Sequence, residues 1–269
     1  MKRPILVALL VTTTFSMFAQ DSTRTRKTSR NQRKEERRQR ISAMIKQEEE
    51  GALIYSKQSV FGVQLRTNGY GIFYELGKLK TRRKTNIYAA ELTEIKDPKE
   101  EKTPPNGFFS FNNPYVFGKI NNFYQLKLGF GQQYLIGQKG NKNGVAVTAI
   151  YHGGISLGLL RPYYLEVNDS TGDRQIKYSV KDSALFLDVS KIRGSGGIGK
   201  GWGEIKMRPG LYAKGAIRFD YGRYNELVSG IEIGISLDVY SEKIPILLYA
   251  KQRQIFIQGH IAILFGKRK

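Results

Sequence analysis

Strict alternation of apolar and polar residues is the feature that most constrains this chain. Branched aliphatic residues occupy every second position of one segment: Ile231, Ile233, Ile235, Leu237 and Val239. The positions between them carry glycine, serine and two carboxylates, Glu232 and Asp238. Because successive side chains of a strand point to opposite faces, one face of this segment is continuously apolar. Residues 254–265 alternate in the same way, so the chain ends on a second such strand.

The first 20 residues have the pattern of a secretory signal peptide. Lys2 and Arg3 precede a short apolar run over 5–11, and a small residue, Ala19, lies near the expected cleavage site. The run is too short for a spanning helix, which needs about 20 apolar residues. No cysteine follows it, which argues against a lipid anchor. A β-sandwich could also alternate, but alternation over about ten residues per strand behind an export signal favours a transmembrane β-barrel.

Turn signals divide the rest of the chain into eight candidate strands. We expect them near residues 59–67, 70–79, 85–95, 121–136, 145–167, 204–222, 231–239 and 255–265. Asn68-Gly69 is a strong hairpin signal between the first two. The sequence therefore predicts an all-β protein, an eight-stranded antiparallel transmembrane β-barrel over residues 59–269.

Loop lengths give an independent test of this strand count. With eight strands, the start of the first strand and the end of the last strand lie on the same side of the membrane. We expect this to be the periplasmic side. The connections expected on that side are short, at 80–84, 137–144 and 223–226. Two connections expected outside are long, near 96–120 and 168–203. Short periplasmic turns with long outer loops are typical of outer-membrane barrels, which predicts outer-membrane localisation.

The chain is strongly basic, with a net charge of +21 that falls to +19 without Lys2 and Arg3. Such a charge normally suggests nucleic acid, but export argues against that partner. We expect instead outer-membrane lipid and lipopolysaccharide, with a possible periplasmic or outer-membrane protein partner. The lack of cysteine removes disulfides, redox catalysis and thiolate metal sites, and we expect no cofactor and no metal.

Residues 21–50 form a separate basic arm, which we expect to be disordered or a short helix on the periplasmic side. Between 21 and 40 it holds nine Lys/Arg against three acids. The residues expected to dock a partner are Arg33, Lys34, Arg37, Arg38 and Arg40. Electrostatic docking and a solvated tail without a partner are both compatible with this composition.

The leader end Phe18-Ala19-Gln20 and the final strand closing on Leu264-Phe265-Gly266-Lys267 resemble those of small outer-membrane β-barrels of Bacteroidota. A terminal strand with an outward aromatic residue near its end looks like the signal read by barrel-insertion machinery. The resemblance covers about residues 59–269 and implies fold and location, not an activity. The basic arm departs from a minimal barrel.

Charged residues recur on the parity opposite the apolar face. They are Glu75, Glu91, Lys127, Lys214, Arg218, Asp220, Glu232 and Asp238. An eight-stranded barrel has an interior just wide enough to be filled with side chains. Because an unpaired ion there is costly, we expect opposite charges to pair and to plug the lumen as a salt-bridge network.

Two patterns suggest enzymatic chemistry, and both are weak. Residues 194–200 (GSGGIGK) match GxGxxG and most of a P-loop, but Gly201 replaces the Ser or Thr that holds magnesium, so we expect a flexible loop. His152 and Ser156 could suggest the catalytic pair of lipid-modifying barrels, but four residues along a strand separate them by about 13 Å. We interpret His152 and His260 as polar residues lining the lumen.

The sequence thus favours a non-enzymatic outer-membrane barrel that acts as an accessory or scaffold subunit of an envelope assembly. A lipid-modifying enzyme using His152 or His260 is the alternative, and a narrow channel is the third hypothesis.

Overall fold

The computed structural model describes residues 33–39, 41–42, 55–104, 113–140, 143–169, 172–222 and 226–269. The chain divides into two units, Met1–Ala52 and Leu53–Lys269. In the first unit, residues 33–39 and 41–42 are helical and their side chains are exposed. The predicted signal peptide lies outside the described residues. No described helix is long and apolar enough to cross a membrane.

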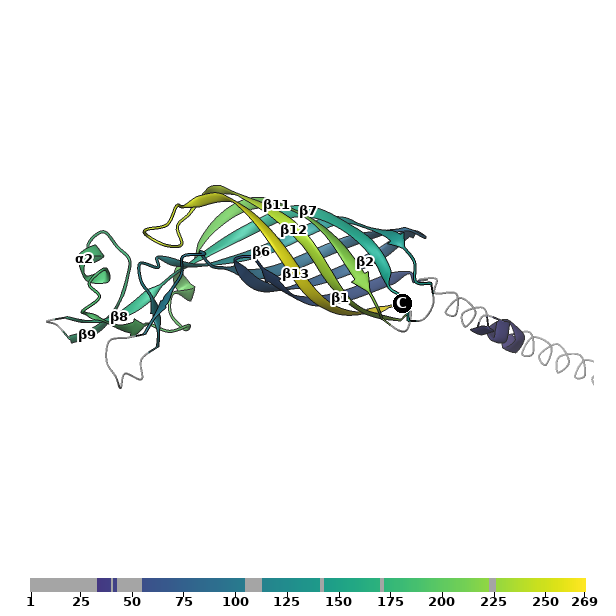
Figure 1. Ribbon diagram of the computed structural model, residues 1–269, viewed down its shortest axis with the longest axis horizontal. Coiled ribbons are helices and arrows are strands. Elements are labelled where there is room, and N and C mark those ends of the chain that lie inside the picture. Colours follow the sequence, from purple (N-terminus) through teal and green to yellow (C-terminus); the bar gives the residue numbers. More distant parts are fainter. Residues whose placement is uncertain are drawn as a thin grey trace, which may run out of the picture. The chain divides into compact units, whose positions relative to one another are not determined.

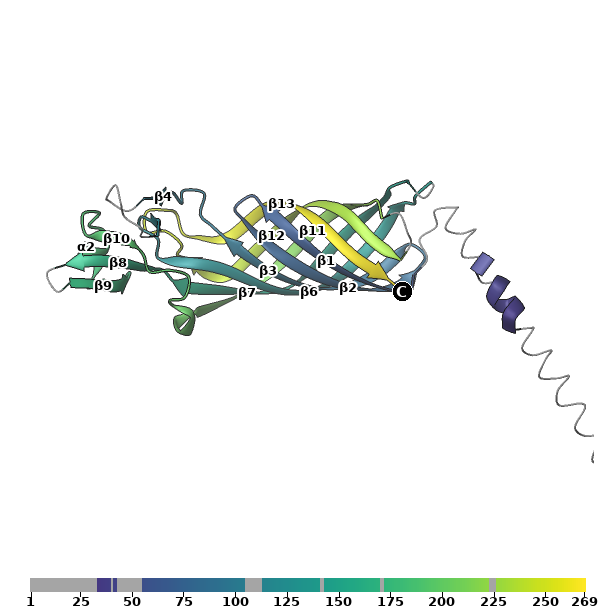
Figure 2. The ribbon, with the colours of Figure 1, turned by 90° about the horizontal axis from the view of Figure 1, so that it is seen from below.

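Eight long strands of the second unit form a closed antiparallel barrel (Figure 1). They are β1 (Lys57–Arg66), β2 (Gly69–Thr81), β3 (Lys84–Ile95), β6 (Asn121–Gly137), β7 (Ala146–Pro162), β11 (Lys206–Asp220), β12 (Leu227–Ile244) and β13 (Arg253–Arg268). Each strand pairs with its neighbours around the ring, and β1 closes it against β13 through pairs such as Val63–Ile263. Figure 2 shows the strands inclined to the barrel axis. The predicted eight-stranded antiparallel transmembrane β-barrel is confirmed.

The alternation in the sequence becomes an inside and an outside. Along β12, exposed Ile231, Ile233 and Leu237 alternate with buried Glu232 and Asp238. The same two-residue period runs along the other barrel strands, so branched and aromatic side chains cover the outer wall. A wall of this composition is the lipid-facing surface of a membrane barrel, whose polar residues face inward.

Most strand boundaries lie close to the predicted ones, but the segment 145–167 does not form one strand. β7 ends at Pro162, where a residue without an N–H group ends the pairing with β6. Tyr163 then donates its backbone N–H to the Ile120 carbonyl, and β8 (Tyr164–Asp169) begins in a different sheet. The prediction of a single strand over 145–167 is therefore wrong at its C-terminal end.

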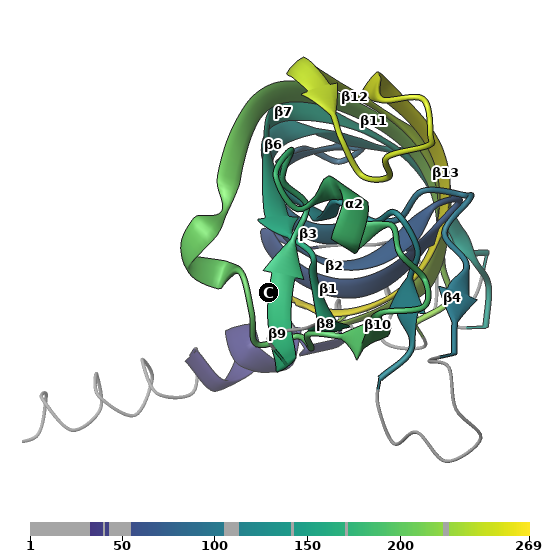
Figure 3. The ribbon, with the colours of Figure 1, turned by 90° about the vertical axis from the view of Figure 1, so that its left-hand side faces the viewer.

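The long connection after β7 is folded. β8 pairs with β9 (Gly172–Lys177) and with β10 (Ile192–Ser195) in a three-stranded sheet, and the short helix α2 (Ser183–Phe186) packs on it (Figure 3). Its core contains Leu165, Val167, Ile176, Phe186 and Ile192. In the other long connection, β4 (Lys102–Thr103) pairs with β5 (Tyr115–Val116). The expected flexible loop at 194–200 is wrong for Gly194 and Ser195, which belong to β10.

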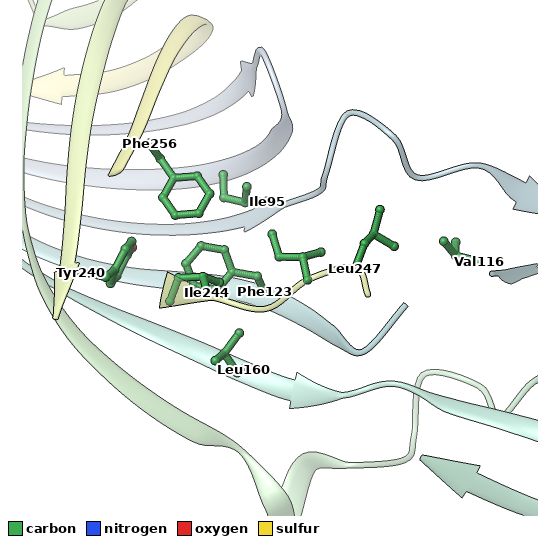
Figure 4. Packing of buried hydrophobic residues seen from close by; sticks show 9 residues of the cluster. Ile95, Val116, Phe123, Leu160, Tyr240, Ile244, Leu247 and Phe256 are labelled. Carbon is green, nitrogen blue, oxygen red and sulfur yellow. The ribbon is translucent and has the colours of Figure 1, made fainter. Parts of the chain in front are cut away.

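An apolar cluster fills the barrel at the end that carries these long connections (Figure 4). Phe123, Tyr240 and Phe256 meet with ring centroids 5.4–6.0 Å apart. Ile246 and Leu247, from the connection between β12 and β13, belong to the same cluster. Because both side chains are buried in this cluster, the connection covers this end of the lumen.

Candidate functional site

The lumen holds the densest set of ionisable side chains in the described chain. All eight charged residues that the sequence places on the inward parity are buried there: Glu75, Glu91, Lys127, Lys214, Arg218, Asp220, Glu232 and Asp238. Seven of them join Arg66 in one continuous chain of ion pairs. Its order is Glu75, Arg218, Glu232, Lys214, Glu91, Arg66, Asp238, Lys127.

The centre of this ion-pair chain is tight. Lys214 Nζ lies 3.0 Å from Glu232 Oε1 and 2.9 Å from Glu91 Oε1. On one side, Arg218 Nη2 lies 2.6 Å from carboxylate oxygens of both Glu75 and Glu232. Each of these cations therefore bridges two carboxylates from different strands, which links β2, β3, β11 and β12 across the lumen.

The other side of the ion-pair chain is looser. Arg66 Nη2 lies 2.7 Å from Glu91 Oε2, whereas its Nη1 lies 3.9 Å from Asp238 Oδ2. Lys127 pairs with Asp238 and completes the chain. Four carboxylates thus face four cations, and the set carries no net formal charge. Such balance is what allows so many ions to lie buried, because an ion without a partner in this setting is costly.

Asp220 belongs to a separate cluster. It pairs with Arg268 and lies 3.8 Å from Lys139 Nζ. Arg66, Lys139 and Arg268 were not among the predicted lumen charges. Arg66 has the same strand parity as Gln64, which faces inward. Arg268 has the parity of Ala262 but lies past the expected end of its strand. Strand parity could therefore have indicated that both face the lumen. Lys139 follows the end of β6, where strand parity gives no information.

The two histidines lie in the lumen, and neither is hydrogen-bonded to a serine of the described residues. His152 Nδ1 lies 3.2 Å from the Tyr212 hydroxyl and its Nε2 lies 3.8 Å from Glu91 Oε1. The Ser156 hydroxyl is 2.8 Å from the Tyr240 hydroxyl instead. His260 Nε2 lies 3.1 Å from Glu232 Oε1. The described residues contain no group of three or more His, Cys, Asp or Glu side chains placed to hold a metal ion.

The predicted docking residues of the arm are only partly described. Arg33, Lys34, Arg37 and Arg38 are exposed on the short helix of the first unit. Arg40 lies outside the described residues. The structure therefore shows these four cations to be accessible and gives no contact for them.

A second basic surface lies at the end of the barrel that carries the C-terminus. Lys57 pairs directly with Lys78 across β1 and β2, and its backbone exchanges two hydrogen bonds with Lys269. All three side chains are exposed. Like charges opposite each other destabilise a sheet, and these three residues, the lysine row, concentrate positive charge at this end of the barrel.

No protein-family model matches the chain, and no curated protein is similar to it in sequence. Among solved structures, it is similar to Neisserial surface protein A, with 9% identity and a TM-score of 0.35 over 79% of this chain and 96% of that one. Ail, the attachment invasion locus protein of Yersinia pestis, in complex with the heparin analogue sucrose octasulfate, shows 10% identity and 0.38 over 80% and 100%. The N-terminal β-barrel domain of Pseudomonas aeruginosa OprF shows 8% and 0.29 over 78% and 98%.

Proposed function

We propose that the protein is a non-enzymatic outer-membrane barrel that serves as an accessory or scaffold subunit of an envelope assembly. The observation that carries this proposal is the filled lumen. A neutral chain of ion pairs crosses it, and an apolar cluster covers one end. With the interior occupied, the surfaces able to bind a partner are the outer wall and the two ends.

The proposed orientation places the start of β1 and the end of β13 in the periplasm. The connections on that side are short: β2 and β3 are joined by two residues, whereas β3 and β6 are joined by a long segment with its own hairpin. Membrane barrels have this asymmetry, with short periplasmic turns and longer outer loops. The leader-like residues 1–20 support delivery to the outer membrane.

The expected partners are lipids and an envelope protein, and no nucleic acid. Phospholipid headgroups or lipopolysaccharide supply the anionic groups that exposed lysines attract, and the apolar wall supplies contacts with acyl chains. The lysine row Lys57, Lys78 and Lys269 supports an anionic partner at the periplasmic end.

A lipid-modifying enzyme is the alternative, because His152 and His260 are buried beside carboxylates. A histidine that activates a serine must lie within hydrogen-bond reach of it. Ser156 is instead bonded to Tyr240, which weakens this alternative. Mass spectra of lipid A from a deletion strain test it, since a lost acyl or phosphate modification would replace the scaffold proposal with the enzyme.

Two measurements test the proposal directly. The full chain in planar bilayers should show no single-channel conductance, because ion pairs and aromatic rings occupy the lumen; a steady unitary current would favour the narrow channel. The tagged barrel, purified from membranes in a gentle detergent, should retain a stoichiometric protein partner. Recovery of the barrel alone, at the yield of a monomer, would contradict the scaffold role.

A further inference from the structure

The glycine-rich segment between β10 and β11 lies against the outside of the barrel. Figure 3 shows the ribbon swinging out to one side of the barrel wall before it enters β11. The short helix η1 (Trp202–Glu204) forms the part next to β11. This segment carries the last four residues of the GxGxxG pattern, which has no nucleotide-binding setting, and its position on the wall suggests a different role.

The ring of Trp202 is docked on the wall. It stacks on Tyr124, with ring centroids 5.8 Å apart and an angle of 20° between the planes. Tyr124 belongs to the outward parity of β6 and pairs with Leu159 of β7, which in turn pairs with Met207 of β11. Trp202 therefore continues the lipid-facing surface of the barrel at the end opposite the C-terminus.

Arg161 fixes the geometry of this segment. Its guanidinium lies 4.8 Å from the Trp202 ring centroid and 5.6 Å from that of Tyr124. The Ile198 carbonyl accepts hydrogen bonds from Arg161 Nη1 at 2.5 Å and from Trp202 Nε1 at 2.8 Å. Two donors on one carbonyl hold the backbone at Ile198 in place, and we call the part of the turn around Ile198 the tip.

The tip presents apolar surface. Ile198 is 80% exposed, Trp202 is 51% exposed and neighbouring Met207 is 62% exposed. In water, an exposed isoleucine held in this position contributes no favourable free energy. If the tip enters lipid, the apolar area of the side chain is removed from water, which is favourable. Tryptophan and tyrosine prefer the boundary between headgroups and acyl chains, and Trp202 and Tyr124 stack on each other at this end of the wall.

Two glycines allow the backbone to form this turn. Gly197 and Gly201 have φ angles of +80° and +84°, which side-chain-bearing residues rarely adopt. A Cβ on Gly201 would lie 2.8 Å from the Pro162 carbonyl oxygen. Neither belongs to the three glycines of the GxGxxG pattern. Of those, Gly194 lies in β10, and a Cβ on Gly196 would lie 2.9 Å from the Cβ of Tyr164, so close packing against β8 accounts for part of the match without a phosphate.

We propose that residues 196–203 form a membrane-interface anchor, in which Ile198 and Trp202 insert into the lipid leaflet at the end of the barrel opposite the C-terminus. Exposed Lys200 lies between them in sequence, where a lysine can keep its ammonium at the phosphate level while its stem lies along apolar surface. The proposal rests on the barrel lying in a membrane, as the proposed function requires.

The anchor is also linked to the three-stranded sheet. Glu204 accepts a hydrogen bond from the Tyr164 hydroxyl at 3.0 Å and pairs with Lys177 of β9. The ammonium of Lys177 holds the pKa of Glu204 below its usual value. Insertion of Ile198 and Trp202 would therefore set the position of β8 and β9 relative to the lipid surface.

Trp202 is the single tryptophan of the chain, so its native fluorescence reports on this segment alone. The full chain is reconstituted in phosphatidylcholine vesicles and in vesicles brominated along the acyl chain. We expect strong quenching in brominated vesicles and weak quenching by aqueous acrylamide. Emission that is insensitive to bromine and quenched freely by acrylamide would overturn the proposal.

Two relocated tryptophans calibrate the measurement, both combined with Trp202→Phe. Phe130→Trp lies on the outer wall in the middle of β6, and Val180→Trp lies in the outer connection at a site that is 88% exposed. Bromolipid quenching of Trp202 above that of Val180→Trp supports the anchor, and quenching equal to it refutes the anchor. If Phe130→Trp is not quenched either, the barrel is not in the membrane and the proposed function itself fails.

A further variant tests the role of the tip. Ile198→Ser leaves both hydrogen bonds to the residue 198 carbonyl intact, so the turn should keep its fold. We expect Trp202 to become less sensitive to brominated lipid and more accessible to acrylamide. Unchanged quenching by both agents would show that Ile198 does not insert.

Discussion

At the scale of single residues, Lys214 is the centre of the lumen. Its ammonium bridges Glu91 and Glu232, and neither carboxylate can reach water. Lys214→Met keeps most of the unbranched side chain, removes the ammonium and leaves excess negative charge. Because removing one partner of a buried ion pair costs about 3–5 kcal/mol, we expect the free energy of unfolding to fall by that amount. Reversible urea unfolding in lipid vesicles measures it.

Lys78→Met is the matched control for this prediction. It removes the same group from an exposed site that faces another lysine, so its effect should stay within about 0.5 kcal/mol. Equal effects of the two substitutions would mean that the ion pairs of Lys214 contribute nothing to stability.

A second residue-scale prediction concerns the space above Gly129. A Cβ at this inward position of β6 would lie 2.1 Å from the Tyr212 hydroxyl, which is bonded to His152. Gly129→Ala should therefore lower the free energy of unfolding by about 1–3 kcal/mol through overpacking. At Gly215, a Cβ would meet no atom within 4 Å. Gly215→Ala should be neutral or stabilise by up to about 1 kcal/mol; a larger loss there would place Gly215 against a neighbour.

Strand parity predicts much of the lumen at this scale, because a two-residue period leaves few choices for where a charge points. It does not reveal which charges meet. The contact between Arg218 and Glu75 joins β11 to β2, which lie far apart in the ring order. That pairing depends on how the staggered strands set the height of each residue, and the sequence pattern contains no such information.

At the scale of elements, β12 shows why the barrel strands were predictable. Its apolar positions face lipid and its polar positions face the lumen, so both environments impose the same period. The three-stranded sheet was missed for the opposite reason. β9 and β10 are six and four residues long, and the burial of β9 does not alternate. Their cohesion comes from packing on Phe186 and Leu165, which lie outside both strands, and a two-residue period cannot reveal such packing.

The prediction at this scale compares two positions of β12 that we expect at different depths in the membrane. Ile233 lies on the outer wall in the middle of the strand, and Leu227 has the same parity at its first residue. Ile233→Arg should destabilise the inserted barrel by about 2–4 kcal/mol, whereas Leu227→Arg near the interface should cost about 0–1 kcal/mol. Folding yield into vesicles and heat resistance of the folded band measure both. Equal behaviour of the two variants would contradict the assignment of this face to lipid.

At the scale of the whole molecule, the location of the excess charge decides what it can do. The ion-pair chain of the lumen is neutral, so it accounts for none of the net charge of +21. The excess must therefore lie largely outside the lumen, in the basic arm, in the lysine row at Lys57 and in the connections. Charge placed there attracts anionic partners over a distance and adds little to the stability of the barrel.

The basic arm gives the prediction that belongs to this scale. If residues 21–50 dock an acidic partner, binding should weaken steeply with salt, because exposed charges are screened beyond about 8 Å at physiological ionic strength. The tagged barrel is purified in a gentle detergent at low and at high salt, with and without residues 21–50. A variant with Arg33, Lys34, Arg37, Arg38 and Arg40 replaced by glutamine keeps the length of the arm and removes its charge.

Docking through charge predicts one outcome. The partner should be recovered with the intact arm at low salt, and lost at high salt, after deletion of the arm and in the glutamine variant. Recovery of the same partner under all conditions would mean that the arm is a solvated tail and that the barrel itself binds. Loss on deletion but not in the glutamine variant would mean that the arm is recognised through its uncharged residues, which would contradict electrostatic docking.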